Sequence, residues 1–219
     1  MTKNTEKAMS LYDKGQYKEA YELIEHSEDT EAHHLLALMF FWGRGVKSQI
    51  QKSLDHFYEA MRRGYLDSFY EFGKLTINLS QEKFIETALL ALESAAKHNH
   101  AEALNFLGTC YLHGTHVKKD VHKAIDYLNK AEKENHPTSI YALGVIYYDD
   151  YFGLMDTKKA YEKFSYLIDH FQHKGAFFML GMMYLEEKFV EKDLMKGLKY
   201  LRQSALQKYA RAEIALSKI

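Results

Sequence analysis

Residues 107–131 read LGTCYLHGTHVKKDVHKAIDYLNKA, and this stretch decides how the rest of the chain is interpreted. Gly108 and Tyr111 fall on one segment whose apolar residues have helical spacing, and Ala124 falls on another. Gly114 lies between the two segments, where a glycine suits a tight turn. The stretch therefore predicts a helix, a short turn and a second helix.

The same unit recurs before and after this stretch. On the first helices, a small residue returns every 35 to 37 residues, at Ala37, Gly73, Gly108, Gly144 and Gly181. On the second helices, a matching register runs through Ser53, Ala88, Ala124, Ala160 and Gly197. Small residues in a fixed register allow neighbouring helices to approach closely, so the pattern predicts five copies of a helical hairpin. The three glycines at 108, 144 and 181 are predicted to lie where helices are closest.

Three aspartates, Asp120, Asp156 and Asp193, stand directly before predicted second helices. A carboxylate in that position accepts hydrogen bonds from free backbone amides and faces the positive end of the helix dipole. Such a cap is worth about 1 kcal/mol. We therefore interpret these aspartates as structural rather than catalytic.

The repeating unit resembles the Sel1-like repeat, a relative of the tetratricopeptide repeat. The central copy carries the residues of this resemblance, namely Ala103, Leu107-Gly108, Tyr111, Gly114, Val117, Asp120 and Lys123-Ala124. The resemblance implies an all-α, right-handed α-solenoid with about thirteen helices and no sheet. Residues 1–30 would form a tetratricopeptide-like hairpin, residues 31–205 five Sel1-like repeats, and residues 206–219 a capping helix.

Composition excludes several classes of partner. The net charge is −1, whereas a nucleic-acid-binding protein usually has a basic face. No apolar run approaches the roughly 18 residues of a membrane helix, and no apolar leader segment is visible near the N-terminus. The single cysteine, Cys110, excludes an intrachain disulfide and fits a reducing compartment. These features predict a cytoplasmic protein with no nucleic-acid partner and no membrane insertion.

The residues that most often carry chemistry lack the required spacing. Among twelve histidines, His113 and His116 come closest to a metal site, but no further ligand stands at zinc spacing. Cys110 falls on the packed side of its helix, where a thiol is usually inert. Gly43-Arg44-Gly45 lacks the lysine of a phosphate-binding loop and reads as a turn. We therefore expect no metal, no cofactor and no enzymatic activity, with a hydrolase as the least favoured alternative.

In tetratricopeptide-like solenoids the first helix of each pair lines the concave face, and the resemblance places aromatic and polar side chains there. The predicted partner-binding residues are His34, Leu38, Phe41, Trp42, Tyr70, Lys74, Asn78, Asn105, Thr109, His113, Tyr141, Val145, Tyr148, Asp149, Phe178, Met182 and Glu186. We expect Trp42, Tyr141 and Tyr148 to act as anchors, because large rigid aromatics dominate interface energies. The alternative is that superhelical curvature buries some of these positions against the neighbouring repeat.

This combination of features favours a non-catalytic module that binds a protein or peptide in a concave groove. The resemblance implies a bacterial adaptor or regulator, with an immunity protein that neutralises a toxin or effector as the alternative. Fold alone does not choose between these roles.

Overall fold

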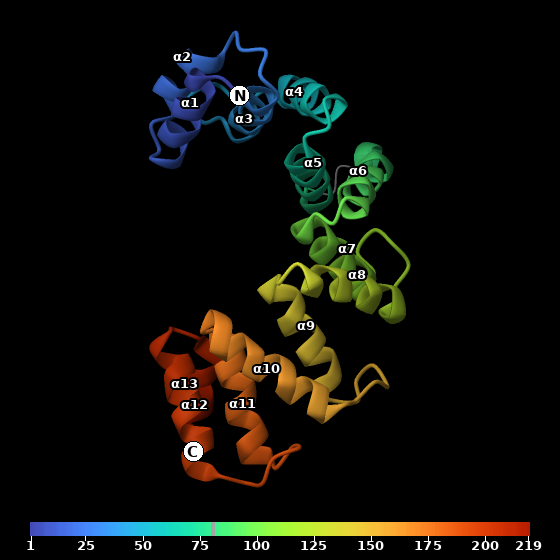
Figure 1. Cartoon of the computed structure of the whole chain (residues 1–219), viewed down its shortest axis with the longest axis vertical. Coiled ribbons are helices and arrows are strands. Elements are labelled where there is room, and N and C mark those ends of the chain that lie inside the picture. The colour runs from blue at the N-terminus through green and yellow to red at the C-terminus, as the bar shows by residue number, and fades with distance from the viewer. Residues whose placement is uncertain (80–81) are drawn as a thin grey trace. The chain divides into compact units, whose positions relative to one another are not determined.

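The computed structural model describes residues 1–79 and 82–219 (Figure 1). This part of the chain contains thirteen α-helices, one short 3-10 helix at Glu82–Phe84, and no strand. The α-helices are α1 (Lys3–Asp13), α2 (Tyr17–Ile24), α3 (Thr30–Trp42), α4 (Ile50–Arg62), α5 (Leu66–Asn78), α6 (Ile85–Lys97), α7 (Ala101–His113), α8 (Val121–Lys133), α9 (Pro137–Tyr148), α10 (Thr157–Phe171), α11 (Lys174–Glu186), α12 (Leu194–Leu206) and α13 (Ala210–Leu216). The predicted all-α fold is therefore confirmed. The division into a hairpin, five repeats and a cap remains a prediction.

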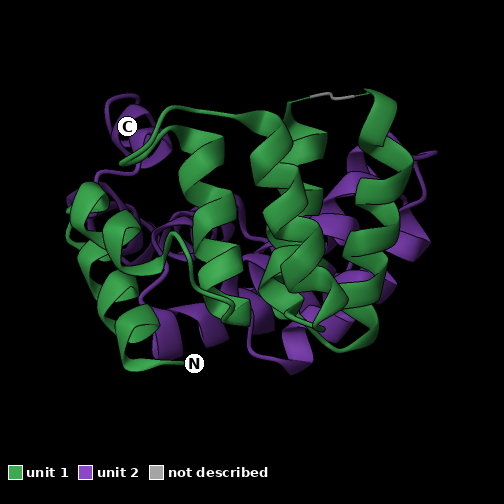
Figure 2. Cartoon of the chain, turned by 90° about the horizontal axis from the view of Figure 1, so that it is seen from above, with its two compact units in different colours: residues 1–103 green, residues 104–219 purple. Residues whose placement is uncertain are grey.

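Internal contacts divide the chain into two compact units, residues 1–103 and residues 104–219 (Figure 2). In unit 1, α1 packs on α2, α3 on α4, and α5 on α6. Asp29, which precedes α3, ties the first hairpin to the first repeat, because its Oδ2 accepts hydrogen bonds from Thr2 N at 2.7 Å and Thr5 Oγ1 at 2.5 Å. These hydrogen bonds lower the pKa of Asp29 to about 2. The core behind them consists of Ala8, Ala20, Ile24, Ala32, Leu35, Leu36, Met39 and Phe40.

In unit 2, α9 packs on α10 and α11 on α12, and α13 packs on α12. One apolar cluster joins α9, α10 and α11 through Ile140, Ala160, Phe164, Leu167, Ala176, Met179, Leu180 and Met183. A second cluster lies around Leu128 of α8 and Leu143 of α9. In unit 2, α10 thus contributes Ala160, Phe164 and Leu167 to the space between α9 and α11.

The glycines in the first helices lie where the sequence predicts close helix packing. A Cβ atom on Gly108 would lie 2.8 Å from Leu128 Cγ, and one on Gly144 would lie 2.6 Å from Phe164 Cε1. A Cβ atom on Gly181 would lie 2.9 Å from Leu201 Cδ2 and 3.1 Å from the carbonyl oxygen of Gly197. The glycine at position 197, where other copies have alanine or serine, is explained by this contact, because the backbones of α11 and α12 meet there.

The three capping aspartates are also confirmed. Asp120 accepts a hydrogen bond from the Lys123 amide at 2.9 Å, and Asp156 and Asp193 accept equivalent bonds three residues on, at 3.0 and 2.9 Å. In the first two copies the residues before the second helix, Gln49 and Phe84, make no side-chain cap. The caps therefore mark the N-terminal ends of α8, α10 and α12 through residues three positions apart.

Candidate functional site

One position of the predicted face is a contact between successive repeats. It lies three residues before the small residue, and its ring centroids stand 4.9 to 5.6 Å from the ring that precedes the next first helix. The ring pairs are His34 with Tyr65, Tyr70 with His100, Tyr141 with His173, and Phe178 with Tyr209. In the third copy, Asn105 Oδ1 accepts a hydrogen bond from Ser139 Oγ at 2.9 Å. These side chains are thus partly buried against the neighbouring repeat, which is the alternative to a partner-binding role given above.

Burial at this position changes the protonation of its members. His34 Nδ1 lies 2.8 Å from Ser68 Oγ, and burial lowers the pKa of His34 to about 4. Burial and a hydrogen bond with Tyr209 raise the pKa of Tyr141 above its ordinary value. His34 is therefore neutral at physiological pH. The predicted anchor Tyr141 already contacts His173 and Tyr209 within the chain. His100 and His136 share one repeat position in the sequence, and sequence reasoning missed that Tyr65, His173 and Tyr209 continue the same spacing of 35 to 37 residues.

Three of these preceding residues are histidines that cap helices. The backbone amides of Ala103, Ser139 and Ala176 donate to the Nδ1 atoms of His100, His136 and His173, at 3.3, 3.3 and 3.2 Å. An imidazole nitrogen that accepts a backbone hydrogen bond is unprotonated, so each Nδ1 is occupied by a structural contact. His100, His136 and His173 therefore have a structural role as helix caps.

Other predicted residues lie at or near the C-terminal ends of the first helices. Trp42 is 53 % exposed, and its ring contacts Phe41 at a centroid distance of 4.8 Å and the Arg44 guanidinium at 5.9 Å. The exposed members of the set are Trp42, Asn78, Thr109, His113, Val145, Asp149 and Glu186, while Leu38, Phe41, Lys74, Tyr148 and Met182 are half-buried. The members from His34 to Asn78 belong to unit 1, and those from Asn105 to Glu186 belong to unit 2.

Among the polar members of the predicted face, Tyr148 and Lys74 already have partners within the chain. Tyr148 Oη donates to Glu186 Oε2 at 2.6 Å, and the Lys188 ammonium lies 3.9 Å from the centroid of the Tyr148 ring. Burial and the Glu186 carboxylate raise the pKa of Tyr148. Lys74 pairs with Glu71 at 2.5 Å and lies 4.7 Å from the Tyr70 ring centroid. Both residues can still contact a partner, but only by exchanging bonds that they make within the chain.

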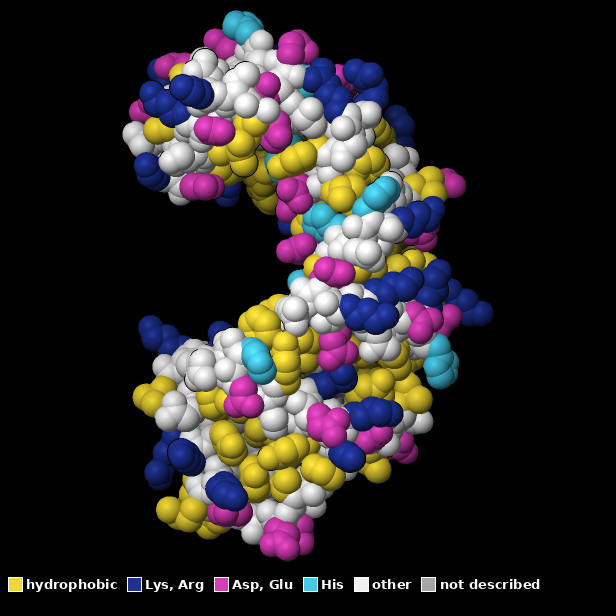
Figure 3. All heavy atoms as spheres, in the orientation of Figure 1, with side chains coloured by type: hydrophobic (Ala, Val, Ile, Leu, Met, Phe, Trp, Pro, Cys, Tyr) yellow, Lys and Arg dark blue, Asp and Glu magenta, His cyan; other side chains and the backbone are white. Residues whose placement is uncertain are grey.

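The apolar members on α11 line a groove in unit 2. This groove, with a volume of about 490 Å³, runs between α11 and α13. Its walls are Phe178, Met182 and Leu185 on α11 and Arg211, Ile214, Ala215, Lys218 and Ile219 on or directly after α13. Figure 3 shows hydrophobic side chains exposed over this end of unit 2, with Lys and Arg side chains beside them. The sequence predicted the α11 wall, whereas α13 was expected only to cap the chain.

A second apolar cavity, of about 500 Å³, lies in unit 1 between α4, α5 and α6. Its walls include Tyr58, Met61, Phe69 and Leu90, of which Leu90 is largely exposed. None of its lining residues belongs to the predicted face. We therefore treat the α11–α13 groove as the candidate site, because there sequence and geometry agree.

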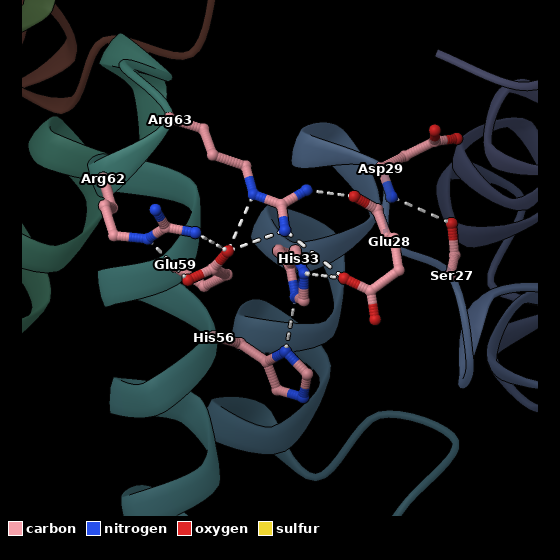
Figure 4. A network of polar contacts seen from close by, with 8 residues as sticks. All are labelled: Ser27, Glu28, Asp29, His33, His56, Glu59, Arg62 and Arg63. Carbon is pink, nitrogen blue, oxygen red and sulfur yellow. Dashed lines mark hydrogen bonds and ion pairs between the residues drawn. The ribbon is translucent and has the colours of Figure 1, made fainter.

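A polar network around His33 and His56 in unit 1 connects neighbouring helices (Figure 4). His33 Nδ1 and His56 Nδ1 lie 3.0 Å apart, and His33 Nε2 lies 3.8 Å from Glu28 Oε2. Beside them Glu59 accepts hydrogen bonds from Arg62 and Arg63, which lower its pKa to about 2. These contacts tie α3 to α4 and α4 to the segment before α3.

A metal site requires several ligands close together, and a reactive thiol requires a lowered pKa. Within residues 1–79 and 82–219, no three His, Cys, Asp or Glu side chains come together in a way that could hold a metal ion. Cys110 is buried, and burial raises the pKa of its thiol to about 11, so the thiolate is rare at neutral pH. In the same ranges no helix is long and apolar enough to cross a membrane.

A Sel1 repeat family model matches residues 30–65, 101–136 and 176–209. The chain belongs to the Sel1-like repeat family. The three matches fall on the first, third and fifth predicted copies of the helical hairpin. The helical hairpins between them, α5 with α6 and α9 with α10, have the same close helix packing at Gly73 and Gly144. No curated protein matches the chain in sequence.

Solved structures share the Sel1-like fold. A Sel1 repeat protein from Oxalobacter formigenes is 18 % identical, with a TM-score of 0.79 over 97 % of this chain and 86 % of that one. A protective antigen of uropathogenic Escherichia coli is 24 % identical, with a TM-score of 0.80 over 99 % of this chain and 48 % of its own. An immunity protein from Pseudomonas aeruginosa is 20 % identical, with a TM-score of 0.57 over 93 % and 80 %. At these identities the likeness concerns the fold.

Trp42→Ala is expected to change the free energy of unfolding of this Sel1-like chain by less than about 1 kcal/mol. The reason is that the Trp42 side chain is mostly exposed and contacts the neighbouring Phe41 ring and the Arg44 guanidinium near the surface. Phe40→Ala, two residues away in the core of unit 1, should destabilise several-fold more. Urea unfolding followed by circular dichroism measures both. Equal losses for the two variants would show that Trp42 belongs to the core and is not available as an anchor.

Proposed function

We propose that this Sel1-like repeat chain binds a protein or peptide partner and catalyses no reaction. Sel1 repeat proteins are generally protein-interaction modules. The observation that carries the proposal is the open apolar groove between α11 and α13, whose α11 wall coincides with predicted partner-binding positions. The lone buried thiol of Cys110 fits a role in a reducing, cytoplasmic setting.

The groove has the properties of a helix- or peptide-docking site. Its interior is apolar, and a contiguous apolar surface on a monomer usually marks a site of association. Its α11 wall is rigid, because α11 meets α12 backbone to backbone at Gly181 and Gly197. A preformed wall reduces the entropy lost on binding. Partner side chains would enter between Phe178, Met182 and Ile214, where hydrophobic contacts supply most of the affinity.

Met182→Asp is expected to weaken peptide binding at least about tenfold, because it places a charge on the α11 wall of the groove. The ligands are peptides selected from a displayed random library on the unaltered chain, and calorimetry measures their affinities. The matched control is Met195→Asp on α12, whose side chain is 74 % exposed and lies outside the groove. The proposal is wrong if no peptide is selected, or if the selected peptides bind both variants alike.

The alternative role is that of an immunity protein which binds and neutralises a toxin or effector. It is favoured by the structural likeness to the immunity protein from Pseudomonas aeruginosa. Such a role calls for a folded partner and a buried area of about 1,200–2,000 Å², which extends beyond the residues of a single groove. In that case Met182→Asp would weaken binding of the folded protein only slightly, while isolated peptides would not bind at all.

A further inference from the structure

The α13 wall of the groove carries charge as well as apolar surface. Arg211, Ile214 and Lys218 follow one another at intervals of three and four residues, so they lie along one side of α13 and its C-terminal extension. Ile214 is 55 % exposed, and a cation lies at each end of it. Arg211 lies on α13 and Lys218 lies two residues beyond its end at Leu216, and a continuous helix of seven residues would span roughly 10 Å along its axis.

Within the described residues, neither Arg211 nor Lys218 lies within ion-pair distance of a carboxylate. The acidic residue at the end of α11 does not neutralise them, because Glu186 is bonded to Tyr148 and lies 3.3 Å from Lys188 Nζ. The α11 wall itself is uncharged along Phe178, Met182 and Leu185. The α11 wall of the groove is therefore apolar. The α13 wall is apolar at Ile214, with the cations Arg211 and Lys218 on either side of it.

We propose that the occupant of this groove is an amphipathic helical segment with two acidic side chains about two turns apart and apolar side chains between them. This inference rests on the proposed function and specifies the chemistry of the partner. Both walls present residues at helical spacing, which a third helix matches with apolar residues at i+3 and i+4. Its carboxylates at i and i+7 would then pair with Arg211 and Lys218 at the solvent edge, where charge complementarity selects the partner and its direction.

The test uses two synthetic helical peptides of about 18 residues, long enough to form a helix on binding. Both carry leucines at the i+3 and i+4 positions, one has glutamate at i and i+7, and the other has lysine at the same places. Fluorescence anisotropy with the full chain is expected to give at least tenfold tighter binding of the glutamate peptide, and this preference should shrink as salt is added.

The double substitution Arg211→Glu with Lys218→Glu is expected to reverse the preference. The control is Lys199→Glu with Arg202→Glu, the same charge change on exposed residues of α12, and it should leave the preference intact. Arg211→Gln with Lys218→Gln should abolish the preference without a change of charge sign, which covers the case in which the glutamates unfold α13.

The outcomes separate the two proposals. Equal binding of the two peptides to the unaltered chain would overturn the acidic partner while leaving peptide binding in the groove intact. Binding of neither peptide would overturn the helical occupant, and the library selection then decides the proposed function independently. A preference that survives the α13 substitutions but not the α12 control would place the acidic site elsewhere and overturn the inference.

Discussion

Gly144→Leu is expected to destabilise unit 2 by about 3 kcal/mol or more, the upper end of the cost of overpacking a core. The Cβ atom alone would lie 2.6 Å from Phe164 Cε1 and 2.9 Å from Phe164 Cζ, which is too close for an unchanged ring position. Phe164 is fully buried between α9, α10 and α11, so it has little room to move aside. Urea unfolding followed by circular dichroism gives the change in free energy.

Two further variants make the result specific to this helix contact. Val145→Leu adds volume at the next residue of α9, which is 36 % exposed, and should change stability little. Gly144→Ala is the more sensitive test, because alanine in place of glycine in an open helix position stabilises by about 1 kcal/mol. A loss of stability for Gly144→Ala therefore reports the contact with Phe164. A gain for either Gly144 variant would show that α9 and α10 are not in the register described.

The fold was predictable from sequence because its determinants are local and repeated. Small residues at one position of every first helix have a direct physical cause, since a side chain there would enter the second helix, as at Gly108 and Gly181. The capping aspartates before α8, α10 and α12 each act within three residues of their own position. Features of this kind can be recognised without knowing the tertiary structure.

The candidate site was only partly predictable, because it depends on contacts between repeats. His34, Tyr70 and Tyr141 were expected to face a partner, but each packs against a ring that comes about 31 residues later in the chain. The α13 wall of the groove was also missed, since its role follows from where α13 packs and not from the repeat pattern. Met182 lies on the α11 wall of the groove, and its role in partner binding stays a prediction.

The free energy of unfolding of unit 1 is expected to fall by about 2 kcal/mol between pH 7 and pH 5 through His34 alone. Burial against Phe57 and Tyr65 lowers the pKa of folded His34 to about 4, whereas a histidine in an unfolded chain has a pKa of about 6.5. As the pH falls below about 6.5, the unfolded chain takes up a proton that the folded chain does not. Stability therefore falls with decreasing pH, down to the folded pKa.

Other titrating groups in unit 1 do not reverse this direction. Nearby Asp67 raises the pKa of His34 and Lys74 lowers it, but both effects are smaller than that of burial. The pKa of His56 is also lowered, by burial and by His33, so it adds to the loss of stability. The folded carboxyl groups of Asp29 and Glu59 have pKa values of about 2, so their contribution is lost only below about pH 4 to 5.

Trp42 makes the measurement selective, because it is the only tryptophan in the chain and lies on α3 together with His34. Urea unfolding followed by its fluorescence at pH 7 and pH 5 reports unit 1. His34→Gln retains a group that can bond Ser68 but cannot take up a proton, so it should remove most of the difference between the two pH values. His26→Gln, at a side chain that is 91 % exposed, should leave the difference unchanged. If unit 1 is as stable at pH 5 as at pH 7, His34 is not held neutral between Tyr65 and Phe57, and the contact between the first two repeats is looser than described.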